Sequence, residues 1–161
     1  MNDPMTILKA DHREVKRLLS AVGESEEGAE RNKMVATLDH DLRLHMQIEE
    51  SIVYPAVAKE VGEEDAEEAN IEHGLAREAL EKLVSMVDAP GFGAVVEMLK
   101  GGISHHVEEE ETELLPELKS ALDRKSWLAL GDEISAAKKR AGAVAKPAPR
   151  RRSAKRAVEP K

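Results

Sequence analysis

The feature that most constrains the fold of this chain is an eleven-residue pattern that occurs twice. The copies are HMQIEESIVYP at residues 45–55 and HVEEEETELLP at residues 106–116, and both follow H-x-x-x-E-E-x-x-x-x-P. They are separated by 61 positions (from 45 to 106), and the same offset relates Asp11-His12 to Glu72-His73. Agreement at three places with one offset indicates an internal repeat of two similar units.

Each unit contributes one lone histidine and, later, a histidine with a glutamate four residues further on. Residues i and i+4 lie on one face of a helix, one turn apart, so the histidine and the glutamate can bind the same object. A lone core histidine is usually just hydrogen-bonded, but six unpartnered buried polar groups would cost on the order of a few kcal/mol each. A metal supplies the partners. The predicted ligands, from four helices, are His12, His45, Glu49, His73, His106 and Glu110.

The composition favours a helical bundle whose metal ligands are nitrogen and oxygen atoms. Of the 161 residues, 35% are charged and 2% are aromatic, so aliphatic side chains must build the core of an expected single domain. The chain has no cysteine, which excludes disulfides, thiolate ligands and cysteine nucleophiles. The remaining ligand types suit iron or manganese, with zinc as a further choice.

Long apolar segments are absent from the sequence. It has neither an apolar run of about 18 residues nor the apolar part of a signal peptide. We therefore expect a soluble, cytoplasmic protein without membrane contact. We also expect a monomer, because no further apolar helix face is evident.

Apolar residues spaced by three and four predict five helices. The first starts at the capping pair Asp3-Pro4 and runs to Val22, and the others cover about residues 29–61, 64–88, 92–122 and 126–140. These helices divide the chain into a bundle over 1–122, an additional C-terminal helix over 123–140 and a disordered basic tail over 141–161.

Prolines and glycines lie close to the predicted ligands. Pro55 and Pro116 fall inside the second and fourth helices, and each should kink its helix just past the ligands. Glycine weakens a helix by about 1 kcal/mol relative to alanine, so the pair Gly101-Gly102, one turn before His106, predicts close helix approach beside the site.

The net charge of −8 conceals two electrically different parts. Residues 138–161 contain ten Lys or Arg and one acid, for a charge of +9, so the preceding 137 residues carry −17. The tail 141–161 resembles basic arms that neutralise nucleic-acid phosphates, although it has no aromatic residue to stack on bases. We favour a solubilising tail lying on the acidic bundle, with sequence-independent nucleic-acid binding as the alternative.

These motifs resemble those of hemerythrin-like (HHE cation-binding) domains. The resemblance covers about residues 1–122 and is carried by Asp11-His12, Glu72-His73 and the two copies of the repeated pattern. It implies an up-down four-helix bundle around a non-haem di-iron centre. A ferritin-like bundle needs Glu-x-x-His on two helices, which Asn70 and Ile103 exclude for the histidines three residues after them.

The resemblance also implies how the ligands are shared. His12 and His45 would hold one iron, and His73 and His106 the other. Glu49 would bridge both irons. Glu110 would do the same, alongside an oxo or hydroxo group.

One departure from the family pattern bears on function. Oxygen-carrying hemerythrins place a further histidine four residues after the third-helix ligand, where this chain has Arg77. Each iron would then have five ligands and an open or water-filled sixth position, which suits reaction better than oxygen carriage. The chain also resembles mycobacterial hemerythrin-like proteins, a group associated with catalase-like breakdown of hydrogen peroxide.

Three functions follow from these patterns. We expect a catalase-like enzyme of oxidative-stress defence whose small-molecule ligand is hydrogen peroxide or dioxygen. The alternative is non-enzymatic oxygen or iron binding, storage or redox sensing at the same centre. A third is a nucleic-acid-associated protein that uses the bundle as a redox sensor.

Tyr54, the only tyrosine of the chain, has two interpretations. On an ideal helix it faces away from His45, which predicts a packing role. Because it adjoins the expected kink, it could instead swing in as an iron ligand or relay protons and electrons. Glu50 is expected to be a supporting or surface acid, whereas Arg77 and Lys16 would stabilise a bound anion if they reached inward.

Overall fold

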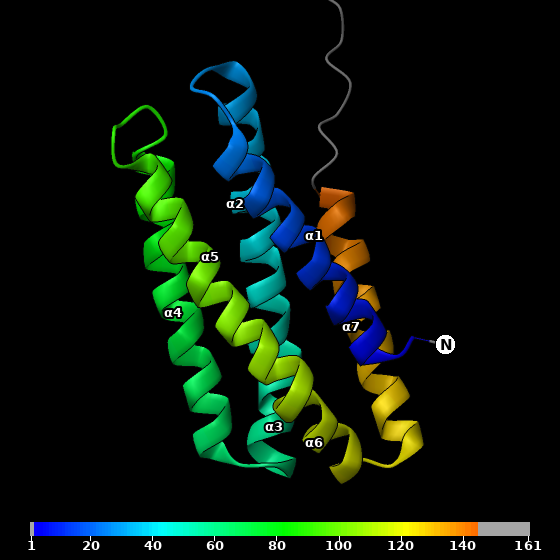
Figure 1. Ribbon diagram of the computed structural model, residues 1–161. Coiled ribbons are helices and arrows are strands. Elements are labelled where there is room, and N and C mark those ends of the chain that lie inside the picture. Colours follow the sequence, from blue (N-terminus) through cyan, green and yellow to red (C-terminus); the bar gives the residue numbers. More distant parts are fainter. Residues whose placement is uncertain (1, 145–161) are drawn as a thin grey trace, which may run out of the picture.

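Five helical rods form an antiparallel bundle in the computed structural model, which describes residues 2–144 (Figure 1). Three rods are single helices: α1 (Pro4–Glu24), α4 (Glu63–Ser85) and α7 (Arg124–Val144). The other two are composite: α2 (Ala29–Ile48), the π-helical turn η1 (Glu49–Val53) and α3 (Tyr54–Glu60) form one, and α5 (Phe92–Glu109), η2 (Glu110–Leu114) and α6 (Leu115–Ala121) form the other. The described residues contain no strand, so the predicted all-α bundle with a fifth helix is confirmed.

The fifth helix, α7, is longer than the sequence predicts. It begins at Arg124 rather than 126 and ends at Val144 rather than 140. The extension includes the alanine-rich stretch 141–144, which we assigned to the tail, and alanine is the strongest helix former. The rest of the predicted tail, residues 145–161, lies outside the described part of the chain.

Asp3 joins the start of α1 to α7. Its carboxylate accepts a hydrogen bond from the backbone N–H of Thr6 at 2.9 Å, which is the expected N-cap, and one from Nε1–H of Trp127 at 2.7 Å. A Cβ at Gly131 would lie 1.6 Å from the backbone oxygen of Asn2, so α7 can approach the N-terminus this closely only with glycine there. These contacts dock α7 against α1 (Figure 1).

Both composite rods have a π-helical turn where we predicted a simple kink at a proline. The N–H of Tyr54 donates to the carbonyl of Glu49, and the N–H of Leu115 donates to that of Glu110, so each bond spans five residues. A proline has no N–H and its ring crowds the carbonyl four residues earlier, and the wider turn accommodates both defects. One extra residue in a turn changes the facing of all later side chains by about 100°.

Aliphatic side chains form two cores with a polar layer between them. Along α1, Leu8 belongs to one core and Val15 to the other, and His12 lies between the two. Among the described residues, the buried polar or charged side chains are His12, His45, Glu49, His73, His106 and Glu110. All six predicted ligands are therefore buried in this layer.

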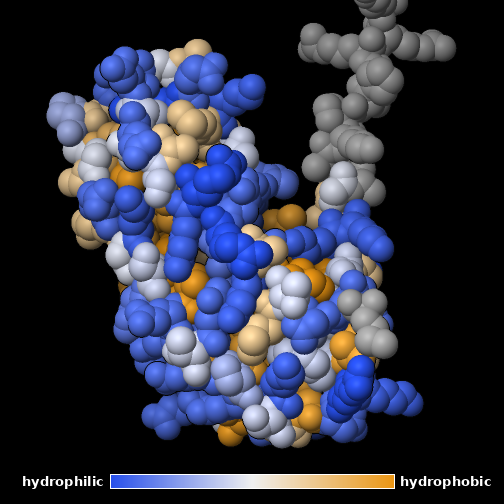
Figure 2. Space-filling view, turned by 45° about the vertical axis from the view of Figure 1, so that its right-hand side comes forward, coloured by the Kyte–Doolittle hydropathy of each residue, from blue (hydrophilic) through white to orange (hydrophobic). Residues whose placement is uncertain are grey.

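The outer surface is largely hydrophilic on the face seen in Figure 2.

Gly101 and Gly102 are exposed, and a Cβ at either would meet nothing within 4 Å. The prediction that they allow close helix approach is therefore wrong, and Ile103 takes the buried position on that turn of α5. No helix in the described part of the chain is both long and apolar enough to cross a bilayer.

Candidate metal centre

Glu49 lies at the centre of the polar layer, on the first residue of η1. Its Oε1 is 3.0 Å from Nε2 of His45 and 3.5 Å from Nε2 of His12. Its Oε2 is 3.1 Å from Nε2 of His73. One oxygen of this carboxylate thus faces two imidazoles, and the other oxygen faces a third.

Glu110 occupies the equivalent position on η2. Its Oε2 lies 3.3 Å from Nε2 of His12 and 3.6 Å from Nε2 of His106. Potential ligand atoms within 4.8 Å of one another form two groups, which share Glu49: His12, His45, Glu49 and Glu110 in the first, and Glu49, His73 and His106 in the second. We call these the first and the second group.

The chemistry of the donor atoms fits metal ions. Buried side-chain atoms without a hydrogen-bond partner include Nε2 of His12, Oε1 of Glu49 and both carboxylate oxygens of Glu110. Unpaired buried polar atoms are rare because each costs the desolvation energy of its group. Cations between these atoms would satisfy them, and nitrogen with carboxylate oxygen suits iron, manganese or zinc.

The pKa values of two histidines show that the buried carboxylates stabilise positive charge next to them. Burial opposes a charge on His12, but hydrogen bonds to Glu110 and Glu49 outweigh burial and raise its pKa to about 10. Burial likewise opposes a charge on His45, whereas Glu49 and Asp11 raise its pKa to about 9. Protons therefore neutralise the buried carboxylates until a metal takes their place.

The two carboxylates respond to their surroundings in opposite directions. Burial raises the pKa of Glu49, but the facing imidazoles, His45 foremost, hold that pKa well below its usual value. The pKa of Glu110 is raised, because burial and the charge of Glu49 outweigh the imidazoles near it. Glu49 is thus the carboxylate with the stronger cationic surroundings.

An outer acid lies at Nδ1 of each of the four imidazoles, and three of these acids accept a hydrogen bond from it. Nδ1–H of His12 donates to Glu111 at 2.7 Å, that of His73 to Glu50 at 2.9 Å, and that of His106 to Glu72 at 2.5 Å. The fourth acid, Asp11, is 3.5 Å from Nδ1 of His45, without a well-aligned hydrogen bond. A proton held on Nδ1 leaves the lone pair of Nε2 directed into the centre, as a metal ligand requires.

These outer acids obey the repeat. Asp11 and Glu72, at the 61-residue offset, serve the second histidine of their own unit, whereas Glu50 and Glu111 each serve the first histidine of the other unit. Sequence reasoning expected Glu50 to be a supporting or surface acid and did not single out Glu111. The equivalence of positions 50 and 111 could have identified it.

Tyr54 points into the centre. Its side chain is 1% exposed, and its hydroxyl oxygen lies 3.0 Å from Nε2 of His73, 3.1 Å from Nε2 of His106 and 3.3 Å from Oε2 of Glu49. The ideal-helix argument that it faces away from the ligands is wrong, because η1 inserts an extra residue before it. The phenol oxygen gives the second group a fourth potential ligand.

The phenol of Tyr54 holds its proton firmly in the metal-free chain. Burial, followed by the nearby Glu49 and Glu110 carboxylates, raises its pKa well above the ordinary value. The hydroxyl is therefore a hydrogen-bond donor at neutral pH unless a cation binds it directly.

Neither of the two cations considered from the sequence reaches the ligands. Arg77 turns to Glu50, with nitrogen–oxygen distances of 2.7 and 2.9 Å, and Lys16 is exposed. The cation that sequence reasoning missed is Lys138 of α7, which pairs with Asp11. We had counted Lys138 with the basic C-terminal segment, and only the docking of α7 brings it to the centre.

Comparisons with known proteins agree with this arrangement. A family model described as the hemerythrin HHE cation binding domain matches residues 3–118. A crystal structure of a hemerythrin HHE cation binding domain-containing protein from Mycobacterium kansasii has a TM-score of 0.77, with 24% identity, and the match covers 89% of this chain and 90% of that one. That likeness shows the shared fold.

Two curated relatives are longer proteins. An uncharacterised hemerythrin-like protein of Schizosaccharomyces pombe is 32% identical over 103 residues, which are 62% of this chain and 51% of that protein. A protein of Nostoc named DNA nickase is 26% identical over 133 residues, which are 82% of this chain and 38% of that protein. With the family match over most of the bundle and the buried histidine–glutamate layer, this chain belongs to the hemerythrin family of HHE cation-binding domains.

Proposed function

We propose that the centre holds two iron ions with a bridging oxo or hydroxo group and decomposes hydrogen peroxide. His12 and His45 would hold one ion, and His73 and His106 the other. Glu49, whose two oxygens face both groups, would bridge them, as would Glu110. When bound, the iron pair supplies the two-electron redox capacity by which one peroxide is reduced to water while another is oxidised to dioxygen, so that two H₂O₂ give two H₂O and one O₂.

The observation that carries this proposal is the small number of protein ligands in the second group. Glu49 and two imidazoles form that group, and Arg77, at the place of a further histidine in oxygen carriers, is engaged with Glu50. Two ions held by so few side chains keep positions for a small reactant, which supports reaction over carriage.

A route from solvent to the second group also supports the proposal. A pocket lined by Glu50, Tyr54, Pro55 and residues of α4 opens beside the second group. Hydrogen peroxide is small and neutral, so the acidic lining of this pocket does not repel it.

Tyr54 is the residue of this chain best placed to handle a proton. Its hydroxyl lies within 3.3 Å of Glu49 and within 3.1 Å of two ring nitrogens, so it can donate to an oxygen held there and be reprotonated through the same contacts. If it binds iron instead, its proton leaves and the phenolate gives a visible charge-transfer band. Tyr54→Phe separates these roles, because only an iron-bound phenolate loses an absorption band.

The test is dioxygen evolution from added peroxide, measured with an oxygen electrode and normalised to bound iron. The full-length protein should bind two irons and evolve one O₂ for every two H₂O₂ consumed. His45→Ala should lose iron and turnover, whereas His40→Ala should keep both, because His40 is 57% exposed and pairs with Asp41 rather than with a residue of the centre. A protein that holds two irons but releases no dioxygen would contradict the proposal.

That negative outcome would favour the alternative, non-enzymatic oxygen or iron binding, storage or redox sensing. A stable, reversible oxygen adduct without turnover would identify it. In either form we propose a cytoplasmic monomer. Sedimentation of the purified protein tests the monomeric state, since four exposed apolar side chains could support self-association: Ile71, Leu75, Val84 and Met98.

A DNA-associated role is a second candidate, favoured by the Nostoc relative named DNA nickase. The basic segment beyond α7 has the charge to neutralise phosphates. Truncation after residue 144 keeps all of α7, including the Lys138 contact, so it should abolish salt-dependent duplex binding without loss of iron. Duplex binding that survives truncation would exclude the tail as its cause.

A further inference from the structure

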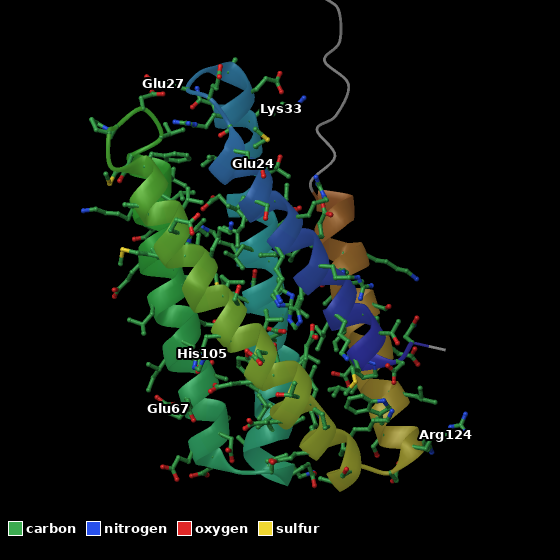
Figure 3. All side chains as sticks on the ribbon, viewed as in Figure 1. Glu24, Glu27, Lys33, Glu67, His105 and Arg124 are labelled. Carbon is green, nitrogen blue, oxygen red and sulfur yellow. The ribbon has the colours of Figure 1, made fainter. Side chains whose placement is uncertain are left out.

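A second, smaller group of potential ligands lies outside the centre, between α4 and α5. It consists of Glu72 on α4 and His105 and Glu109 on α5, which offer one ligand atom each within 4.8 Å of one another. Nε2 of His105 is 3.1 Å from Oε1 of Glu109, one helical turn away. Figure 3 shows His105 where these two helices run side by side. We call these three residues the outer cluster.

Two residues of the outer cluster, Glu72 and Glu109, line a pocket that extends to the buried centre. Besides Glu110 of the centre, six carboxylates line it: Asp65, Glu68, Glu72, Glu109, Glu113 and Glu117. In the part of the chain that the structure describes, none of the six pairs with a lysine or arginine within 4 Å. His106 and Glu110 of the centre line the same pocket, and Glu110 is 1% exposed with both carboxylate oxygens unpartnered. The pocket therefore ends at a buried carboxylate whose oxygens accept no hydrogen bond and could bind a cation.

The repeat indicates what the outer cluster lacks. Glu72 is the equivalent of Asp11, and each lies against Nδ1 of the second histidine of its unit. Asp11 is neutralised by Lys138 of α7. Among the described residues Glu72 pairs with no lysine or arginine; besides His106, it lies near His105 and Glu109. A bound cation there would complete for Glu72 the role that the lysine performs for Asp11.

We propose that the outer cluster is a divalent-cation site through which ferrous iron reaches the centre, an inference that rests on the proposed iron centre. One imidazole and two carboxylates are ligands that suit Fe²⁺, Mn²⁺ and Zn²⁺. A cation captured there passes along the lining carboxylates to Glu110. Acidic walls of low dielectric raise the local concentration of cations, so the pocket speeds loading as well as directing it.

Loading kinetics test the route. Metal-free full-length protein, checked for helix content by circular dichroism, is mixed with Fe²⁺ without oxygen, and the unbound ion is followed with a chelating dye. His105→Ala and Glu109→Gln should each lower the initial rate about tenfold, the lower end of electrostatic and capture effects in charged clefts. Both variants should still reach two irons per chain, because neither residue belongs to the centre.

Matched controls separate the site from general changes. His40→Ala removes an exposed histidine that pairs with an acid on its own helix, and Glu81→Gln removes an exposed carboxylate of α4. Both should load at the wild-type rate. In a second measurement, iron-loaded wild-type protein is titrated with Zn²⁺ and should bind one further ion, which His105→Ala and Glu109→Gln should not.

The outcomes distinguish this inference from the proposed function. An unchanged loading rate in His105→Ala and Glu109→Gln would overturn the outer site, and so would wild-type protein that binds no additional Zn²⁺. A final content below two irons in these variants would place the residues in the centre and also overturn it. Slow loading with full iron content but no dioxygen evolution from peroxide would leave the outer site standing and remove only the peroxide reaction.

Discussion

The two halves of the centre are built on one plan but are chemically unequal. Each has two imidazoles, an inner carboxylate at the start of a π-helical turn, and outer acids at Nδ1. The residue that closes the turn differs: it is Tyr54 in the first unit and Leu115 in the second, both fully buried. The phenol reaches the second group, whereas the leucine brings no polar atom to the first.

The outer acids also differ in their own partners. Asp11 pairs with Lys138 and Glu50 with Arg77, but Glu72 and Glu111 have no lysine or arginine partner among the described residues. The first group has four potential ligands and lies on the side of α7. The second group has three potential ligands and the phenol of Tyr54, and the acidic pocket extends to it. Duplication supplies the frame of histidines and glutamates, and a few single-residue differences make its two halves unequal.

The largest expected effect comes from the carboxylate shared by both groups. Glu49→Gln should reduce bound iron from two ions to nearly none, because Glu49 faces three imidazoles. Glu110→Gln, whose carboxylate faces two, should keep about one ion. Iron analysis after desalting measures both. Equal losses would show that the two bridging positions are equivalent.

The next effect concerns the phenol. Tyr54→Phe should lower peroxide turnover about 100-fold with two irons retained, because the proton donor nearest the second group is lost. The volume-conserving change Leu115→Met at the equivalent position should leave turnover unchanged. Initial rates of dioxygen evolution per iron decide it. Full activity in Tyr54→Phe would leave the two halves chemically alike.

Removing an outer acid should weaken iron binding about 10- to 100-fold, since the acid fixes the orientation and the tautomer of its imidazole. Glu50→Gln should cost more than Glu111→Gln, because it also leaves Arg77 without its partner. Competition with a chelator of known affinity gives both constants. The reverse order would mean that the arginine contributes nothing to the second group.

The smallest expected effect is at the edge of the first group. Lys138 is 35% exposed, so Lys138→Met should lower the free energy of unfolding by about 1 kcal/mol or less. Iron should dissociate from the variant only a few-fold faster, through a less firmly held Asp11. Urea unfolding and iron release provide the two readouts. Release as fast as in the Glu50→Gln variant would show that α7 belongs to the centre itself.

The helices and the six ligand candidates follow from sequence because they depend on local spacing. His45 with Glu49 and His106 with Glu110 are one turn apart on any helix, and the repeat supplies His12 and His73. The burial of these six polar side chains can be predicted without knowing the neighbouring helices, because each lies on the apolar face of its own helix.

The features missed from the sequence depend on distortion or on distant packing. Tyr54 was misplaced because ideal periodicity does not allow for η1, although the prolines at matching positions of both units mark the distortion. Glu111 and Glu50 reach imidazoles of the opposite unit, and Lys138 arrives with α7; none of these distances is encoded in local spacing. The two glycines at 101–102 lie neither in a turn nor at a close helix contact, and nothing in the structure explains them.

The wide turn η1 also sets the direction in which the later side chains of its rod face, so a change of one residue in its length would rotate them about the helix axis. Ser51 is exposed and lies within that turn, so its deletion would remove the extra residue without removing any ligand candidate, and the proline would then kink an ordinary helical turn. The downstream segment would then rotate, withdrawing the aromatic hydroxyl from the second group while the four histidines keep their positions. A protein of this fold can thus gain or lose a phenol beside its buried histidines and glutamates by a one-residue insertion or deletion, without any substitution.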